Sequence, residues 1–280
     1  ELIRKGYTSF KVYTTYDKLK LDDGQMLDVL HTAGREGALV MVHAENNDII
    51  KWIAQRLLDN GHVAPKFHAV SHDPLAESEA THRVIALSRL LDVPVLIVHV
   101  SGIEAVRHIR HAQTLGARIF AETCPQYLWM TLEETLGQPG FEGSKYVCST
   151  PVRSRDNDPH YIGQMGHGHQ GDLWKGLRMN ELAVVSTDHC PFCFKDQKEL
   201  GLGDFSKIPN GIGGVEHRME LIYQGVVAGE LTLERWVETC CTTPARMFGM
   251  YPQKGIIAPG SDADIVVWDP NTKTKIGIND

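Results

Sequence analysis

The fold class follows from the segment Leu39-Val40-Met41-Val42-His43, an apolar run that ends on a histidine. The segment Val95-Leu96-Ile97-Val98-His99 repeats this pattern further along the chain. Apolar residues at successive positions indicate strands that are covered on both faces, as in a parallel sheet. Helical patterns separate these runs, and strands that alternate with helices predict an α/β fold.

Five strand–helix units are predicted, with strands around Phe10, Val40, Leu96, Ile119 and Val184. The predicted helices span residues 25–35, 48–60, 75–91, 102–115, 172–180, 215–228, 233–241 and 244–248, and residues 124–170 and 190–214 are interpreted as irregular loops. No glycine-rich phosphate loop follows a strand. Four of the strands are predicted to end on polar residues that are candidates for a functional site: Lys11, His43, His99 and Asp188. Both observations favour a (β/α)8 barrel, which gathers its chemistry at the carboxyl ends of its strands, over an open sheet. Five strands make only part of such a barrel.

The C-terminal tail differs from the rest of the chain. It contains a turn and one short predicted strand around Ile265, but no helical pattern. We therefore predict that residues 1–250 form the barrel portion and that residues 251–280 are part of a small β appendage. Because a two-stranded fragment is only marginally stable, the tail is expected to pair with further strands.

The composition disfavours several partners and compartments. The chain has 280 residues, 42% of them hydrophobic, and a net charge of −7. It has no long basic run, so nucleic acid and anionic membranes are poor partners. Its apolar runs are far shorter than the ~18 residues of a membrane span, and no signal-peptide pattern stands at its start. A cytoplasmic protein is expected.

Two further polar residues follow apolar runs and complete a set of candidate metal ligands. Lys11 stands in Thr8-Ser9-Phe10-Lys11-Val12-Tyr13, and Asp188 ends Ala183-Val184-Val185-Ser186-Thr187-Asp188. Imidazole and carboxylate together suit zinc or a similar divalent ion, so His43, His99 and Asp188 predict a shared site. A buried ammonium beside a dication is disfavoured. Lys11 therefore either extends to the surface or reacts with CO₂ to form an anionic carbamate that bridges two metals.

Most other histidines and all six cysteines are predicted to have no ligand role. Nine histidines lie in polar or helical contexts and are expected at the surface: His31, His62, His68, His72, His82, His108, His111, His160 and His217. The pair His167-Gly168-His169 follows no strand, so we interpret it as a decoy. Cys190-Pro191-Phe192-Cys193 has no second pair at zinc-ribbon spacing, which favours ordinary loop thiols.

At these residues the chain resembles the cyclic amidohydrolases, and most closely the dihydropyrimidinases and D-hydantoinases. The resemblance covers nearly the whole chain. The matching segments are Ser9-Phe10-Lys11-Val12-Tyr13, Val42-His43-Ala44-Glu45-Asn46, Val98-His99-Val100-Ser101, Ser186-Thr187-Asp188-His189-Cys190-Pro191-Phe192, the segment from Pro209 to Met219 and the segment from Ala258 to Val266.

The resemblance implies the hydrolysis of a dihydropyrimidine or hydantoin ring by a metal-bridging hydroxide at a binuclear centre. Lys11 would be the carbamylated lysine that bridges two zinc ions, and His43 and His99 would bind the second ion. Asp188 would bind the first ion and carry the proton from the attacking hydroxide to the leaving nitrogen. These roles imply an enzyme of pyrimidine catabolism that acts on C–N bonds in cyclic amides.

The resemblance also implies substrate-binding residues. Tyr16 would donate a hydrogen bond to the substrate carbonyl as negative charge develops on it. Ser149 and Asn210 match positions whose backbone holds the cyclic amide. The partners implied are a small cyclic amide or imide and further copies of the same chain, since the family commonly forms homotetramers.

One departure from the family pattern concerns the first metal. The family places an H-x-H pair on the first barrel strand, well before the lysine, whereas only ten residues precede Lys11. On this alignment the chain holds about strands 4–8, and we expect it to be incomplete and inactive as it stands. Two other functions stay open: an allantoinase or dihydroorotase type of amidohydrolase, and a non-catalytic scaffold of the collapsin-response type.

Overall fold

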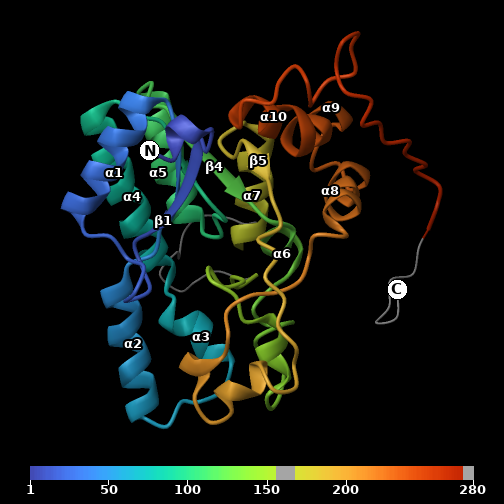
Figure 1. Cartoon of the computed structure of the whole chain (residues 1–280). Coiled ribbons are helices and arrows are strands. Elements are labelled where there is room, and N and C mark those ends of the chain that lie inside the picture. The colour runs from blue at the N-terminus through green and yellow to red at the C-terminus, as the bar shows by residue number, and fades with distance from the viewer. Residues whose placement is uncertain (156–167, 274–280) are drawn as a thin grey trace.

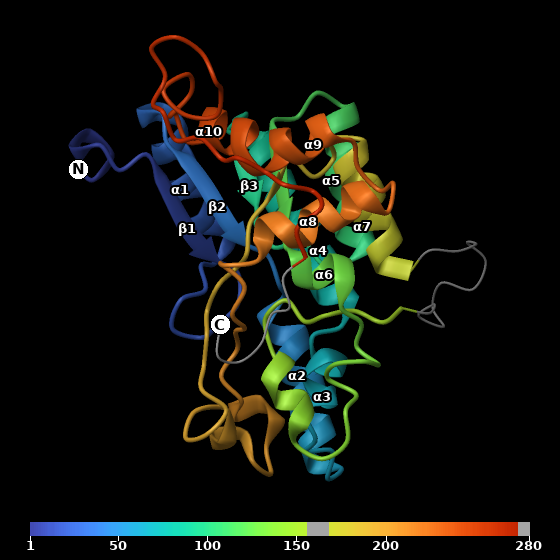
Figure 2. The ribbon, with the colours of Figure 1, turned by 90° about the vertical axis from the view of Figure 1, so that its right-hand side faces the viewer.

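A computed structural model describes residues 1–155 and 168–273 of the chain (Figure 1). One five-stranded parallel sheet crosses the molecule in the order β1-β2-β3-β4-β5. Its strands are β1 (Ser9–Tyr13), β2 (Leu39–His43), β3 (Val95–Ile97), β4 (Ile119–Thr123) and β5 (Val184–Val185). Each strand pairs with the next one along the chain, whereas a doubly wound sheet reverses its order. Figure 2 shows β1 and β2 side by side with their arrows pointing the same way. The predicted partial barrel is therefore confirmed.

Helices alternate with the strands and cover one face of the sheet. The α-helices are α1 (Asp23–Glu36), α2 (Asn47–Asp59), α3 (Lys66–Ser71), α4 (Pro74–Leu91), α5 (Ile103–Thr114), α6 (Pro125–Trp129), α7 (Gly168–Arg178), α8 (Arg218–Val227), α9 (Leu233–Val237) and α10 (Thr243–Met247). Short 3₁₀ segments are η1 (Ile3–Lys5), η2 (Glu142–Tyr146), η4 (Lys198–Gly201) and η5 (Phe205–Lys207), and η6 (Glu238–Thr242) is a turn of π-helix. Helix α1 packs against α4, α4 against α5, and α5 against α7. Such a row of neighbours is the outer helix layer of a barrel wall.

The long helices begin where the sequence offers side-chain caps. Asp22 and Gln25 form a capping box at α1, and Asn46 accepts from two backbone N–H groups at α2. Asp73 caps α4 with Pro74 in the first helical turn, as the sequence predicts. None of the described helices is long and apolar enough to cross a membrane.

Strands β3 and β5 are fully buried, as predicted from their apolar runs, whereas β1, β2 and β4 are buried less completely and leave Lys11 and Phe120 exposed. The face toward the helices contributes the main core, to which β2 adds Val40 and Val42 and β3 adds Val95 and Ile97. A second, smaller cluster lies on the opposite face and is formed by Leu96, Val98, Val184 and partly buried neighbours. This opposite face is the interior face of the barrel wall, because side chains alternate along each strand.

Several local elements differ from the sequence predictions. Helices α3 and α6 are too short to show a period, and packing of side chains such as Phe67 on Phe205 holds α3 in place. Helix α7 begins at Gly168 instead of residue 172. The helix predicted over 233–241 passes into the π-turn η6 before Pro244, whose ring disfavours a regular helical bond there.

The described part of the tail, residues 251–273, contains no strand. The short strand predicted around Ile265 is therefore wrong for this part of the chain. Its backbone runs extended along one side of the molecule (Figure 1), and Ile265, Val266 and Val267 are exposed. Trp268 packs against Trp236 of α9, which is how the tail joins the main core. The domain boundary at residue 250 stays a prediction.

A buried ion pair ties the carboxyl-end loops of the sheet together. The Arg153 guanidinium donates to the Glu77 carboxylate at 2.9 Å, to the Ser101 hydroxyl at 3.0 Å and to the backbone carbonyl of His72. Glu77 also accepts from the backbone N–H and the hydroxyl of Ser101, both at 2.8 Å. Both charged side chains are almost fully buried, so this cluster is a rigid base under the loops that carry the site.

We expect Arg153→Met to lower the free energy of unfolding by about 3–5 kcal/mol, because it leaves the Glu77 charge buried without its partner. Arg155→Met is the matched control, since the Arg155–Glu134 pair is more than half exposed and is expected to contribute about 1 kcal/mol or less. Urea unfolding of both variants measures the difference. Equal losses in the two variants would contradict the importance of the buried pair.

Candidate active site

Lys11 lies in the middle of β1 and faces Asp188. The prediction that it closes its strand is wrong, because Val12 and Tyr13 continue the ladder with β2 beyond it. Its Nζ atom is 3.9 Å from Oδ1 of Asp188, and both side chains are about one third exposed or less. Asp188 itself comes three residues after the end of β5. The structure thus brings these two candidates together across the open side of the sheet.

His43 and His99 meet at the carboxyl ends of β2 and β3. His43 is the last residue of β2, and His99 comes two residues after β3 ends. Nδ1 of His43 lies 3.0 Å from Nε2 of His99, and both rings are buried. Burial, assisted by the neighbouring His43 and Lys11, holds the pKa of His99 well below its usual value. His99 is therefore a neutral imidazole, the form that binds metals.

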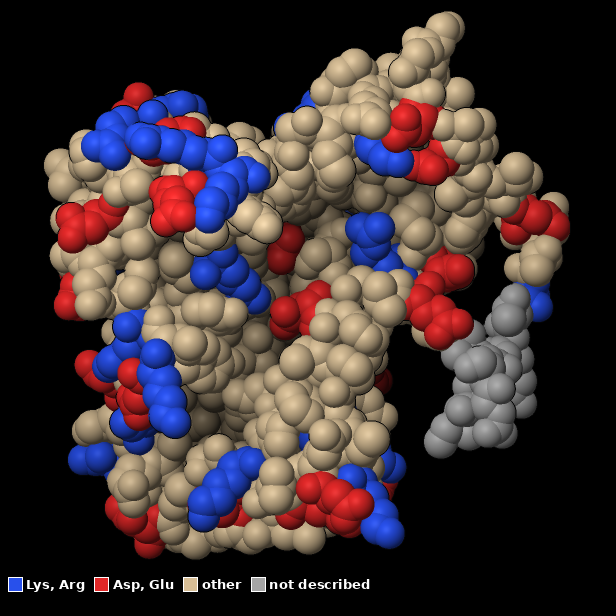
Figure 3. Space-filling model, viewed as in Figure 1, with Lys and Arg blue, Asp and Glu red and all other residues tan. Residues whose placement is uncertain are grey.

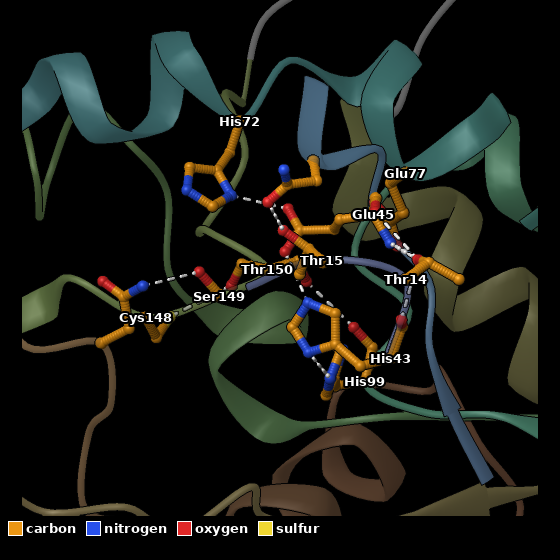
Figure 4. A network of polar contacts seen from close by, with 12 residues as sticks. Thr14, Thr15, His43, Glu45, His72, Glu77, His99, Cys148, Ser149 and Thr150 are labelled. Carbon is orange, nitrogen blue, oxygen red and sulfur yellow. Dashed lines mark hydrogen bonds and ion pairs between the residues drawn. The ribbon is translucent and has the colours of Figure 1, made fainter. Parts of the chain in front are cut away.

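Glu45 holds the His43 ring and connects it to His72 (Figure 4). Nε2 of His43 is 2.7 Å from one Glu45 oxygen, and Nδ1 of His72 is 2.7 Å from the other. Burial by itself would raise the pKa of Glu45, but the two histidines hold it well below its usual value. A carboxylate on Nε2 leaves the Nδ1 lone pair of His43 free to point at a ligand.

The contacts of Glu45 with the histidines were not predicted from the sequence. His72 was predicted at the surface, yet it is buried, as is His68, whose Nε2 lies 2.9 Å from the Cys148 carbonyl oxygen. Both predictions are wrong because α3 packs against α2 and η5, and a helix of six residues has too short a pattern to reveal its buried face. Glu45, two residues after His43, was the one available signal.

We expect Glu45→Gln to weaken metal binding about 10- to 100-fold, the usual effect of losing a carboxylate that orients a histidine ligand. Chelator competition with zinc measures the affinity directly. Glu79→Gln is the control, because Glu79 bonds Asn46 from the adjoining segment but lies at the surface. An unchanged zinc affinity in Glu45→Gln would show that this carboxylate has no orienting role.

Tyr16, Ser149 and Asn210 form the second part of the site. The Tyr16 hydroxyl lies beside the side chains of Ser149 and Asn210, which act to lower its pKa. Nδ2 of Asn210 donates to Oγ of Ser149 at 3.1 Å. The Tyr16 ring lies against the His43 ring, with 5.4 Å between their centroids. The predicted substrate-binding residues are therefore neighbours of the predicted metal ligands.

The backbone at the site is strained. Among the described residues, six other than glycine have positive φ, and three of them are Tyr16 (68°), His99 (43°) and Asp188 (49°). Left-handed backbone is costly for such residues and clusters at functional sites. The sequence pattern contains no sign of this feature, which supports the same residues independently.

Glu122 of β4 lies beneath the ligand candidates. One of its carboxylate oxygens accepts from the backbone N–H of His99 at 3.3 Å. Burial raises its pKa to about 7, although hydrogen bonds from Ser186 and His99 and the charge of Lys11 act in the opposite direction. At pH 7 a carboxyl group with this pKa is about half ionised, so Glu122 adds a partial negative charge behind His99, beside the charges of Glu45, Lys11 and Asp188.

The His43–His99 pair fits a divalent metal ion. Two nitrogens that bind one zinc ion tetrahedrally at ~2.0–2.1 Å lie about 3.3 Å apart, which is close to the observed 3.0 Å. Among the described residues, no three His, Cys, Asp or Glu side chains converge enough to hold a metal ion by themselves. Further donors are therefore needed, and a carbamate on Lys11 has the right charge for this role.

The remaining predictions concern residues outside the site. His169 is buried in α7, where its Nδ1 accepts from the backbone N–H of Ile103 at 3.2 Å, so it has a structural contact away from the ligand candidates. His160 and His167 lie outside the described residues. Cys190 and Cys193 are exposed free thiols rather than partly buried ones, and the interpretation of this C-x-x-C as an ordinary loop segment stays a prediction.

Figure 3 shows a hollow in the middle of one face of the molecule, with side chains of both charges along its edge. A hollow at the carboxyl ends of parallel strands is the usual place for a barrel active site. The sequence matches the model of the Amidohydrolase family over residues 5–279. The chain belongs to the amidohydrolase family.

Several named proteins and solved structures are similar to this chain over nearly its whole length. A D-hydantoinase of Streptomyces coelicolor is 50% identical over 276 residues, which are 98% of this chain and 56% of that protein. The structure of a D-hydantoinase from Bacillus sp. AR9 matches with a TM-score of 0.92 at 41% identity, over 99% of this chain and 58% of that one. A dihydropyrimidinase from Brevibacillus agri matches with a TM-score of 0.87 at 43% identity, over 94% and 54%. The predicted resemblance is confirmed, and the chain spans a little over half the length of these relatives.

Proposed function

We propose that the protein hydrolyses the amide bond of a small cyclic amide or imide, either a dihydropyrimidine or a hydantoin. The observation that carries this proposal is the position of Tyr16. Its ring packs against His43 of the proposed metal pair, and its hydroxyl lies beside Ser149 and Asn210. One residue thus lies between the proposed metal site and polar side chains that can bind a ligand. Family membership and the names of the relatives support the substrate class.

The proposed cofactor is a pair of divalent metal ions, most readily zinc. The Lys11 ammonium group would lose two protons as its nitrogen adds CO₂, which turns a cation into an anionic carbamate whose oxygens would hold both ions. His43 and His99 would hold one ion, and Asp188 the other. When bound, the ions would lower the pKa of a water molecule so that it can lose a proton and act as a nucleophile near neutral pH. They would also polarise the substrate carbonyl.

The protein's own residues would complete the reaction. Asp188 accepts the proton that the attacking water loses and donates it to the ring nitrogen as the C–N bond breaks. Tyr16 donates a hydrogen bond to the carbonyl oxygen as negative charge develops there. Burial, with the charge of Glu45, raises the pKa of Tyr16 to about 12, so its hydroxyl keeps its proton at neutral pH. Ser149 and Asn210 hold the amide edge of the ring.

A substrate panel tests the proposal. The protein is expressed from its complete gene, loaded with zinc and bicarbonate, and assayed on dihydrouracil, hydantoin, allantoin and dihydroorotate. We expect the highest kcat/KM for dihydrouracil or hydantoin. A preference for allantoin or dihydroorotate would assign the other amidohydrolase type. Metal binding without turnover of any ring would overturn the proposal in favour of a non-catalytic scaffold.

We also propose a cytoplasmic homotetramer that binds neither nucleic acid nor membranes. The acidic composition and the lack of a basic run support the part that concerns nucleic acid and membranes. Light scattering coupled to size exclusion, on the product of the complete gene, measures the mass of the assembly.

A further inference from the structure

Lys198 is a buried lysine that directs its charge at three backbone carbonyls. It begins η4, and its side chain is 2% exposed. Its Nζ atom donates to the carbonyl oxygens of Val147 at 2.9 Å, Pro209 at 2.7 Å and Gly211 at 2.8 Å. An ammonium group has three protons, so each proton has one carbonyl as its partner.

The three carbonyls belong to two segments that carry the candidate substrate-binding residues. Val147 lies two residues before Ser149, and Pro209 and Gly211 flank Asn210 on both sides. The segments also touch each other directly, because the Gly211 N–H donates to the Val147 carbonyl oxygen at 2.9 Å. Without the ammonium group, buried carbonyl oxygens with like partial charges would converge on an empty centre.

We propose that Lys198 is a positioning residue that locks segments 147–149 and 209–211 into one rigid substrate-binding edge. This inference rests on the proposed function, in which Ser149 and Asn210 hold the cyclic amide. Lys198 itself does not reach the substrate, because its three donors are used within the protein. A purely structural role would lower stability alone, whereas a positioning role raises KM in the folded enzyme.

The protonation of Lys198 offers a second way to observe the lock. Burial lowers its pKa to about 8. The groups that face it are the thiols of Cys148 and Cys190, the His68 imidazole and the ring of Phe192. Burial raises the pKa of Cys148 to about 12 and lowers that of His68 to about 3, so both stay neutral near pH 8. As the pH rises through about 8, Lys198 loses one proton and one carbonyl loses its donor.

The kinetic test uses Lys198→Met, with Lys207→Met as the control, since Lys207 lies at the surface of the same loop and pairs with Asp204. For a substrate whose ring does not ionise in this range, we expect KM to rise about 10- to 100-fold, the effect of a displaced binding group, while kcat changes far less. The rise of wild-type KM above about pH 8 should persist in Cys190→Ser and disappear in Lys198→Met. Unchanged KM in Lys198→Met would overturn the proposal.

Chemical rescue distinguishes the effect of the Lys198 N–H donors from the effect of its positive charge. Lys198→Ala lacks the atoms of propylammonium, so added propylammonium should lower its KM toward the wild-type value. Tetramethylammonium carries the same charge without N–H donors and should have no effect. Equal rescue by both cations would contradict a lock made of hydrogen bonds.

Hydrogen exchange keeps the test independent of activity and of the proposed function. In wild-type protein, the protection of amides in 147–153 and 209–214, expressed relative to the intrinsic exchange rate at each pH, should fall together above about pH 8. At pH 7 this protection should be lower in Lys198→Met than in Lys207→Met. If the wild type opens no cyclic amide while exchange behaves in this way, the proposed function fails and the lock remains. If exchange in the two segments does not depend on Lys198, the proposal is wrong whatever the activity.

Discussion

Lys11→Ala should abolish both metal binding and hydrolysis in the protein expressed from its complete gene. Without the Lys11 amine no carbamate forms, so the proposed metal bridge disappears. The water molecule then keeps the pKa of bulk water, far above neutral pH, compared with about 7 on a zinc ion, and turnover should fall below detection. Metal analysis and an assay on dihydrouracil measure the two effects.

Short carboxylic acids should partly restore metal content and activity in Lys11→Ala, because they supply the missing anionic oxygens in the space of the side chain. Lys20→Ala is the control, since Lys20 lies close after β1 but is exposed and only pairs with Asp48. A wild-type sample prepared with ¹³C-bicarbonate should show a carbamate carbon signal that the variant lacks. Full metal content in Lys11→Ala would refute the bridging role.

Asp188→Asn should lower kcat by about 10²- to 10⁴-fold, the usual contribution of a general acid–base group. Asparagine keeps the size of the side chain and tolerates the left-handed backbone at this position, so the loss reports the carboxylate. The substitution also removes a proposed anionic metal ligand, and one of the two proposed ions should be held more weakly. Steady-state kinetics and metal titration of the same sample separate these two effects.

Asp196→Asn is a close control for that experiment. Asp196 lies in the loop after Asp188, is exposed and also has a positive φ of 69°. An Asp-to-Asn change there tests the backbone conformation without touching the site. A loss of activity in Asp196→Asn as large as in Asp188→Asn would mean that the loop, and not the Asp188 carboxylate, determines turnover.

The apolar runs predicted the strands closely because periodicity is a local property. Strand β2 has the predicted bounds, and the predicted helices 48–60 and 75–91 match α2 and α4 within one residue at each end. The same reasoning missed α3 and placed the start of α7 too late. Short elements such as α3 depend on contacts with distant segments, and a local pattern does not contain those contacts.

The candidate ligands could be found in the sequence because strand ends in a parallel sheet converge. His43 and His99 end similar apolar runs, so the sequence could predict that they lie near each other. The structure gives the distance between their ring nitrogens, 3.0 Å. The place of Lys11 within its strand was not predicted correctly, because an apolar run does not show where the ladder ends. The groups around the ligands were also missed, since His72 reaches Glu45 only through the fold of α3.

By itself, the sequence determined the α/β class, the parallel strands and the identity of the candidate ligands, because these depend on residue type and on local periodicity. Only the tertiary structure showed that Glu45 joins His43 to His72, and that Lys198 closes three carbonyls from two separate segments. The physical reason is that a buried charge is tolerated only with partners. Those partners come from segments far apart in the chain, where no local pattern connects them.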